Sequence, residues 1–249
     1  MEIVPIHYHD YTAHYALDAF DMVLPEDMGH FRRHQEKRRF QCISRLVPKQ
    51  GVMHVLDVGA GSGWLSEMLV SRGFETNALD LGLDSILRAK KRLERRSIAV
   101  PFTEGDVYRL PYRSGSFDAA VASEILEHLE KPKEALSEIA RVLRPGGWII
   151  VSTPYRERIE ETLCIHCNRK TPVNAHLHAF DERTLTELLK TAGFTPPRLV
   201  KFLNRPAERF GIAGFTGFLP YAAWRIPDAF ICRILGRESF IAARAERNA

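Results

Sequence analysis

The chain has 249 residues, of which 45% are hydrophobic and 27% are charged, and its formal net charge is +4. This length predicts a single domain over residues 1–249 with a core of its own, and the small positive charge does not by itself indicate a nucleic-acid partner. No apolar run approaches the roughly 18 residues of a membrane span, and the N-terminal MEIVPIHYHD lacks the charged-then-apolar order of a secretion signal, so we expect a cytoplasmic protein.

Residues 1–50 are expected to form a helical arm or lid. Apolar residues recur at loose helical spacing between 26 and 47. The segment RRHQEKRR, residues 32–39, is interpreted as a solvated basic face rather than a nucleic-acid patch. The earlier HYHDYTAHY, residues 7–15, is either a lid of aromatic and imidazole groups or an irregular arm packed on a sheet.

Between residues 51 and 154, short apolar strands alternate with helices. The predicted strands are 52–58, 74–80, 98–106, 116–123 and 148–154, and the predicted helices are 64–72, 83–96 and 131–143. Such alternation predicts a parallel sheet with helices on both faces. After a break at 155–180, a helix at 181–194 and strands at 198–204 and 238–246 complete the pattern.

A glycine-rich loop follows the first predicted strand, in VLDVGAGSGW at 55–64. Gly59, Gly61 and Gly63 have the spacing GxGxG, and the bulky Trp64 stands where a dinucleotide fingerprint needs a small residue. Asp57 would repel a pyrophosphate but favour an ammonium group. No Lys-Ser or Lys-Thr pair follows, which excludes a P-loop.

Two further acids end the next predicted strands. Asp80 stands where a carboxylate accepts hydrogen bonds from ribose hydroxyls, and Asp106 could accept from an exocyclic amine such as adenine N6. A ligand with an amino-acid end, a ribose and an adenine but no phosphate meets these demands. S-adenosylmethionine is such a ligand.

Four motifs in this order resemble the class I S-adenosylmethionine-dependent methyltransferases, the broad group that includes small-molecule and quinone-type enzymes. They are VLDVGAGSGW, NALDLG, GDVYRLPYRSGSFDAAVASEILEHLEKP and ALSEIARVLRPGGWIIVSTP, together about residues 50–155, with AGF at 192–194. The resemblance implies a Rossmann-like, seven-stranded, mostly parallel sheet with an antiparallel final strand. It also implies methyl transfer to a small acceptor, here expected to be apolar or aromatic.

Two other functions stay open: a non-catalytic partner subunit with this fold, and a methyltransferase acting on RNA or protein. Against the latter, SEIL at 123–126 stands where an Asn-Pro-Pro-Tyr-type amine clamp would be. The sequence also has no appended nucleic-acid module.

The resemblance also implies roles for single residues. The three glycines would admit the methionine end of the ligand, Asp57 would orient its amino group, and Ser123 would lie beneath the sulfonium. The remaining implied contacts are Asp80 to the ribose, Leu81 to the adenine ring, and Asp106 with the Val107 backbone to the adenine edge. No catalytic residue is assigned; the candidates for a general base are His128, Glu124 and Tyr155.

The segment CIHCNRKTPVNAHLHAF, residues 164–180, offers metal ligands. Cys164 and Cys167 have the spacing of a zinc knuckle, and His176 and His178 could complete four ligands, with His166 a rival for the fourth. The alternatives to structural zinc are thiols and histidines that line the substrate pocket, and a redox pair.

Residues 205–236 are rich in Phe, Trp and Ile. We expect this segment to form an apolar cap between the last two strands, in the C-terminal part of the domain (181–249). The alternatives are an apolar substrate pocket and a peripheral membrane contact.

Overall fold

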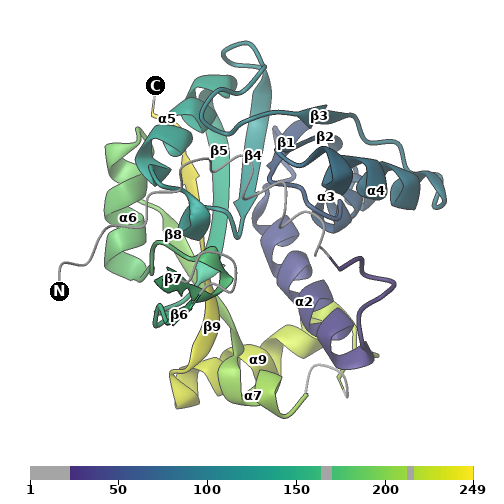
Figure 1. Ribbon diagram of the computed structural model, residues 1–249, viewed down its shortest axis with the longest axis vertical. Helices are drawn as coiled ribbons and strands as arrows, with labels where there is room; N and C mark the ends of the chain where they lie inside the picture. The colour runs from purple at the N-terminus through teal and green to yellow at the C-terminus, as the bar shows by residue number, and fades with distance from the viewer. Residues whose placement is uncertain (1–22, 164–169, 212–215, 249) are drawn as a thin grey trace.

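The computed structural model describes residues 23–163, 170–211 and 216–248 (Figure 1). Its helices are α2 (His30–Leu46), α3 (Trp64–Ser71), α4 (Leu83–Glu94), α5 (Pro132–Val142), α6 (Glu182–Thr191), α7 (Arg205–Arg209) and α9 (Tyr221–Leu235), with 3-10 turns η1 (Leu126–His128) and η2 (Val173–Ala175). Its strands are β1 (His54–Val58), β2 (Glu75–Asp80), β3 (Phe102–Glu104), β4 (Phe117–Ser123), β5 (Leu143–Pro154), β6 (Glu161–Leu163), β7 (Lys170–Pro172), β8 (Arg198–Asn204) and β9 (Glu238–Glu246).

Seven strands form one sheet in the order β3-β2-β1-β4-β5-β9-β8. The five strands β1 to β5 are parallel, and β9 runs antiparallel to both of its neighbours, β5 and β8. The predicted mostly parallel sheet with an antiparallel final strand is therefore confirmed. Because the strand order reverses between β1 and β4, the carboxyl ends of these two strands mark the point where open α/β sheets bind ligands.

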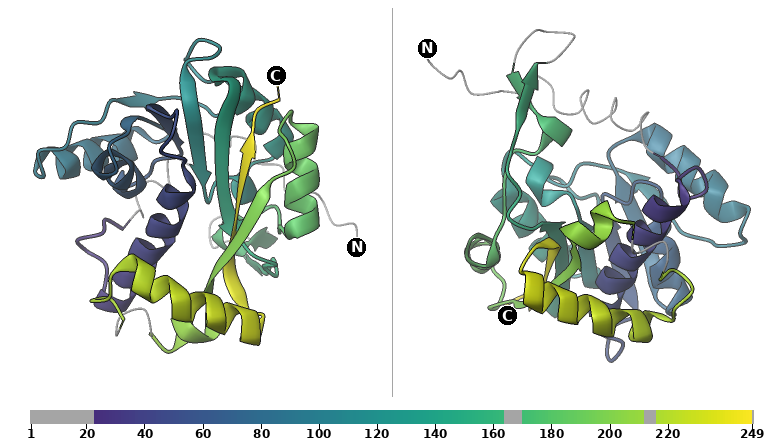
Figure 2. Two further views of the ribbon diagram at one scale, coloured as in Figure 1. Left: turned by 180° about the vertical axis from the view of Figure 1, so that it is seen from behind. Right: turned by 90° about the horizontal axis from the view of Figure 1, so that it is seen from below.

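Helices cover both faces of the sheet, as predicted (Figure 2). Alternate residues of each central strand enter different cores: Ala120 and Ala122 pack with α5 and α6, whereas Ala119 and Val121 pack with α2, α3 and Trp224 of α9. This alternation follows from the period of two in a strand. Since both faces are buried, the strands read as continuous apolar runs in the sequence.

Two strands differ from their predicted limits by more than two residues at one end. β3 spans only Phe102–Glu104, the middle of the expected 98–106. β5 begins at Leu143 rather than at residue 148, because Phe117 pairs with Leu143 and Ala119 with Trp148, so the Pro-Gly-Gly segment between them bulges out of register.

The basic segment of α2 is not a solvated face throughout. Arg32 and Arg33 are exposed, but Arg38 is only 1% exposed. Its guanidinium donates to the carbonyl oxygens of Thr216 (3.0 Å) and Leu219 (2.7 Å). The sequence interpretation was wrong for this residue, which joins α2 to the segment before α9.

The insertion and the cap contain more regular structure than the sequence indicated. Within 155–180, β6 and β7 pair as an antiparallel hairpin. Within 205–236, α7 and α9 are helical, and α9 packs on β8. The expected lid at 7–15 and the two cysteines of the CxxC lie outside the described residues.

Candidate cofactor and acceptor site

The glycine loop turns sharply between β1 and α3. The backbone N–H groups of Gly59 and Ala60 both donate to the carbonyl oxygen of Leu79, at 2.8 and 3.0 Å. Gly59 has φ +70°, and a Cβ atom there would lie 2.4 Å from Cγ2 of Ile125. Gly63 begins α3 with φ +69°. The turn therefore requires glycine at both positions.

A cavity of about 400 Å³ opens beside this loop at the carboxyl edge of the sheet, a size typical of small-molecule sites. It is lined by Val23, Met28, Arg32, Glu36, Arg39, Phe40, Asp57, Gly59, Ala60, Gly61, Ser62, Leu65 and Ser123. Residues from α2 thus form one wall, and the loop forms the other. Of the predicted cofactor residues, the cavity brings together Asp57, Gly59, Gly61 and Ser123.

Asp57 is the buried acid of this cavity, only 1% exposed. Ser66 donates its hydroxyl to Oδ2 at 2.5 Å. Burial, together with the nearby Asp80, raises the pKa of Asp57 to about 7, although the hydrogen bond from Ser66 lowers it. A buried carboxylate that faces a cavity fits the ammonium group of S-adenosylmethionine, because a cation would restore the favourable charged state.

Asp80 and Asp106 end or follow strands at the same sheet edge but do not line the cavity. Asp80 accepts from the N–H groups of Gly61 (2.7 Å) and Gly82 (2.9 Å), so it holds the glycine loop in place. Burial raises its pKa. Asp106 accepts from the N–H of Tyr108 at 2.9 Å. The other predicted contacts are Leu81, half-buried after β2, and Val107, packed against the core.

The three candidates for a general base lie in different surroundings. Glu124 has φ +56°, accepts from the hydroxyl of Ser152 at 2.8 Å and lies 3.6 Å from Arg39. Tyr155 is buried and donates its hydroxyl to Glu182 at 2.7 Å, which directs it toward α6. His128 contacts the ring of His176, with the ring centroids 4.7 Å apart.

Sequence reasoning missed a largely buried group of metal-ligand residues formed by η1 and the segment after β7. Glu127, His128 and His176 each offer one ligand atom, and these atoms lie within 4.8 Å of one another. Glu157 contacts Nδ1 of His176. The EH pair at 127–128 was visible in the sequence, but His176 reaches it only because the chain folds back after β7.

The predicted zinc ligands have different positions. His176 belongs to the buried group, whereas Nε2 of His178 lies 2.8 Å from the carbonyl oxygen of Leu129. Cys164 and Cys167 lie outside the described residues, so the four-ligand set stays a prediction.

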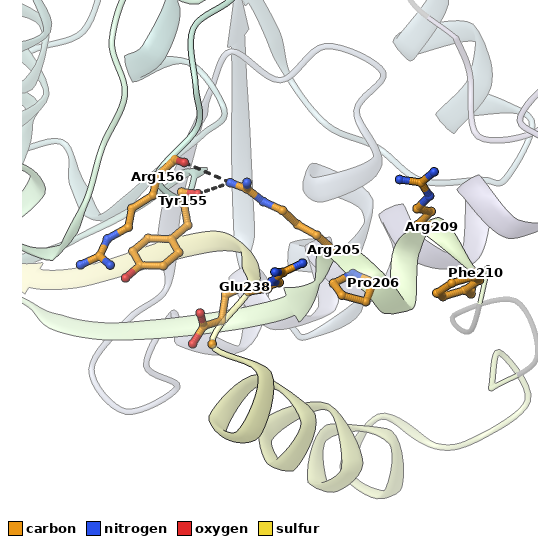
Figure 3. Close-up of a pocket in the computed structure, with 9 residues that line it drawn as sticks. Tyr155, Arg156, Arg205, Pro206, Arg209, Phe210 and Glu238 are labelled. Atoms are coloured by element: carbon orange, nitrogen blue, oxygen red, sulfur yellow. Dashed lines mark hydrogen bonds between the residues drawn. The ribbon is translucent and has the colours of Figure 1, made fainter.

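A second cavity, of about 650 Å³, lies where β5 ends and β9 begins (Figure 3). Arg205 crosses it and donates to the carbonyl oxygens of Tyr155 (2.5 Å) and Arg156 (3.2 Å). Its full lining is Tyr155, Arg156, Arg205, Pro206, Arg209, Phe210, Gly236, Arg237 and Glu238. Four arginines and one glutamate line this cavity, and since among the described residues only Arg156 of the four pairs with a glutamate outside the lining (Glu182, 3.2 Å), the cavity has a positive character.

Comparison with known proteins identifies the core. Residues 56–151 match the family model described as a methyltransferase domain. A probable S-adenosylmethionine-dependent methyltransferase of Mycolicibacterium smegmatis is 32% identical over 172 residues, which are 69% of this chain and 61% of that protein. A ubiquinone biosynthesis O-methyltransferase of Ralstonia nicotianae is 29% identical over 199 residues, 77% of this chain and 83% of that protein.

The fold agrees with a solved structure as well. The 1,6-didemethyltoxoflavin-N1-methyltransferase of Burkholderia thailandensis, with bound 1,6-didemethyltoxoflavin and S-adenosylhomocysteine, superposes with a TM-score of 0.62 at 20% identity, covering 100% of this chain and 94% of that one. Over its core the chain is therefore similar in sequence to S-adenosylmethionine-dependent methyltransferases, and its fold is that of a solved methyltransferase. The chain spans about three fifths of the length of the first curated relatives that it matches.

Proposed function

We propose that this protein transfers a methyl group from S-adenosylmethionine to a small acceptor with an apolar or aromatic body. The observation that carries the proposal is the cavity at the strand-order reversal, where the glycine loop and the buried Asp57 meet Ser123. The sulfonium of the donor supplies an electrophilic methyl group. The protein then has to hold the donor, align the acceptor and exclude water.

Two of the predicted cofactor residues, Asp57 and Asp80, have separate roles in this proposal. Asp57 orients the amino group of the donor. Asp80 retains acceptor capacity for ribose hydroxyls beside its two backbone contacts, since each carboxylate oxygen has two lone pairs. The wall from α2, which includes Arg39 and Phe40, excludes water from the donor cavity.

The arginine-lined cavity supports a more specific acceptor. Phe210 is 72% exposed and offers aromatic surface, and four guanidinium groups outnumber the one carboxylate of Glu238, which already lies 3.3 Å from Lys201. Arginine binds carboxylate and phosphate groups in a bidentate manner. We therefore propose an acceptor that joins an aromatic or apolar body to an anionic group.

We also propose a peripheral contact of α9 with an anionic membrane surface, which would suit an apolar acceptor. Ile226, Phe230 and Ile234 follow one another at four-residue spacing and are 73, 65 and 63% exposed. Arg233 and Arg237 are exposed nearby. Within the described residues, no helix has the length and apolar character needed to cross a bilayer.

Substitution of Asp80 tests the assignment of the donor. We expect Asp80→Ala to weaken S-adenosylmethionine binding by about 1–3 kcal/mol, the cost of an unpaired polar contact, as measured by titration calorimetry. Asp84→Ala, which removes an exposed acid at the start of α4, is the matched control and should leave the affinity unchanged. An unaltered affinity in Asp80→Ala would contradict the ribose contact.

Transfer itself is tested with methyl-labelled S-adenosylmethionine and a panel of acceptors. We expect label in hydroxylated aromatic acids. Donor binding without transfer to any acceptor would favour the non-catalytic partner subunit. Transfer to RNA or to protein, with salt-dependent RNA binding in the first case, would favour the other alternative.

A further inference from the structure

Glu127 is a buried carboxylate without a hydrogen-bond partner among the described residues. It follows β4 in η1 and is 1% exposed. Burying a carboxylate without a partner is costly, so such a group indicates a missing cation or a retained proton.

Two imidazoles face this carboxylate. The rings of His128 and His176 meet edge to face with their centroids 4.7 Å apart, and the ligand atoms of all three residues lie within 4.8 Å of one another. This separation suits three ligands around one ion, since metal–ligand bonds of about 2 Å place neighbouring ligand atoms about 3–4 Å apart after a small adjustment.

The backbone holds the three residues in place from two sides. The N–H groups of Leu177 (2.6 Å) and His178 (3.2 Å) both donate to the carbonyl oxygen of Glu127, which fixes the segment of His176 against η1. Glu157 contacts Nδ1 of His176 and so leaves Nε2 as the nitrogen available to an ion. A carboxylate behind a ligating histidine is a common arrangement in metal sites.

We propose that Glu127, His128 and His176 bind a divalent transition-metal ion, with Glu157 orienting His176. Two imidazoles and one carboxylate favour Zn²⁺, Fe²⁺, Co²⁺, Ni²⁺ or Mn²⁺ over Ca²⁺, which prefers oxygen ligands. Three protein ligands leave at least one coordination position open, as in catalytic rather than structural zinc sites.

The site lies next to the donor cavity. Ser123 lines that cavity, its hydroxyl lies 3.1 Å from that of Ser152, and the Ser152 hydroxyl donates to Glu124 at 2.8 Å. Glu127 follows Glu124 by three residues and lies in η1. The metal site itself does not depend on the proposed function, but its role does.

In that role the ion would bind an acceptor hydroxyl and lower the pKa of this hydroxyl. The hydroxyl proton would pass to water, the oxygen would form the new bond to the methyl carbon, and the electron pair of the broken carbon–sulfur bond would remain on sulfur. The products are the methyl ether, S-adenosylhomocysteine and a proton. The proposal thus favours transfer to oxygen.

Metal binding is tested on the full chain carrying no polyhistidine tag. After chelator treatment, Co²⁺ is titrated and followed by its visible absorption, and the bound metal is counted by mass spectrometry. We expect one ion per chain, and at least 100-fold weaker binding in Glu127→Gln and in His176→Ala. Glu157→Gln should weaken binding about 10- to 100-fold.

Two control variants separate this site from the cysteine–histidine set. His178→Ala and the double variant C164S/C167S should bind Co²⁺ as the wild type does. Absence of bound metal in the wild type would overturn the proposal, as would loss of metal in C164S/C167S with full binding in Glu127→Gln. Thermal unfolding confirms folding: Co²⁺ should raise the melting temperature of the wild type but not of Glu127→Gln.

The same titration distinguishes failure of this proposal from failure of the proposed function. Stoichiometric Co²⁺ with no binding of S-adenosylmethionine would contradict methyl transfer and leave the metal site standing. Donor binding and methyl transfer without any bound ion would contradict the metal site and leave the proposed function standing.

Discussion

Asp57 shows how one buried carboxylate couples stability to pH. Its pKa is about 7 in the folded protein against an ordinary value of 3.8, because burial disfavours the charged form. Below the ordinary value, both the folded and the unfolded states are protonated and the residue has no effect. Between about pH 4 and pH 7, the unfolded state is ionised while the folded state keeps its proton, so the free energy of unfolding falls as pH rises.

We therefore predict that Asp57→Asn stabilises the protein relative to the wild type at pH 8 but not at pH 4. The amide removes the buried charge and can still accept the hydrogen bond from Ser66. Urea unfolding midpoints of both proteins between pH 4 and pH 8 measure the effect. Parallel curves for the two proteins would show that Asp57 titrates at its ordinary pKa.

The glycine loop depends on space as well as on backbone conformation. Gly59→Ala introduces a side chain at φ +70° and places its Cβ atom 2.4 Å from Cγ2 of Ile125. We expect a loss of about 2–4 kcal/mol in the free energy of unfolding, from conformational strain and from the steric clash.

A double-mutant cycle separates these two causes. In Ile125→Ala the clashing methyl group is gone, so the cost of Gly59→Ala should be smaller in that background by about 1 kcal/mol or more. Additive effects, measured by urea unfolding, would show that strain alone requires this glycine.

At the scale of secondary-structure elements, α9 carries the clearest prediction. Its exposed residues Ile226, Phe230 and Ile234 should insert into the interface of an anionic bilayer, with nearby arginines binding the headgroups. We expect the protein to co-sediment with vesicles containing phosphatidylglycerol, and at least fivefold less after Phe230→Ser.

The control for this prediction is Leu87→Ser, which removes an apolar residue of α4 that is 54% exposed and lies outside α9. Equal binding of Phe230→Ser, Leu87→Ser and the wild type would contradict the role of α9. Binding to purely zwitterionic vesicles, but not to vesicles that contain phosphatidylglycerol, would contradict the role of the arginines.

The elements that sequence patterns predicted well are those that follow a local rule. β9 has the predicted limits, Glu238–Glu246, and α6 begins after Asp181, which accepts from the Thr184 N–H as a helix cap. The glycine loop was recognisable because its backbone turn leaves few residue types acceptable. The bulge in β5 was not, because it depends on pairing with β4.

Side chains whose surroundings come from distant segments could not be predicted. The sequence pattern places Arg38 on a solvated basic face of α2. In the fold it is buried and donates to carbonyl oxygens of residues 216, 217 and 219. Glu127 and His176 are separated by a strand, a helix and a hairpin, so only the folded chain places them together. The residues of the donor cavity were easier to predict from the sequence, because parallel strands bring their carboxyl ends to one edge of the sheet.

For the whole molecule, donor binding should appear as global stabilisation, because the donor cavity joins α2, the glycine loop and the end of β4. A ligand at 100 times its Kd adds about 2.7 kcal/mol to the free energy of unfolding. For a chain of this size that corresponds to a rise of about 5–11 °C in Tm.

S-adenosylmethionine should produce this rise in a thermal unfolding experiment, and NADH and ATP should produce none. Asp80→Ala should show a smaller rise at the same donor concentration, while Asp84→Ala should match the wild type. Stabilisation reports binding to the folded chain alone. A rise in Tm with NADH and none with S-adenosylmethionine would therefore mean that the glycine loop binds a pyrophosphate, although the charge of Asp57 disfavours one.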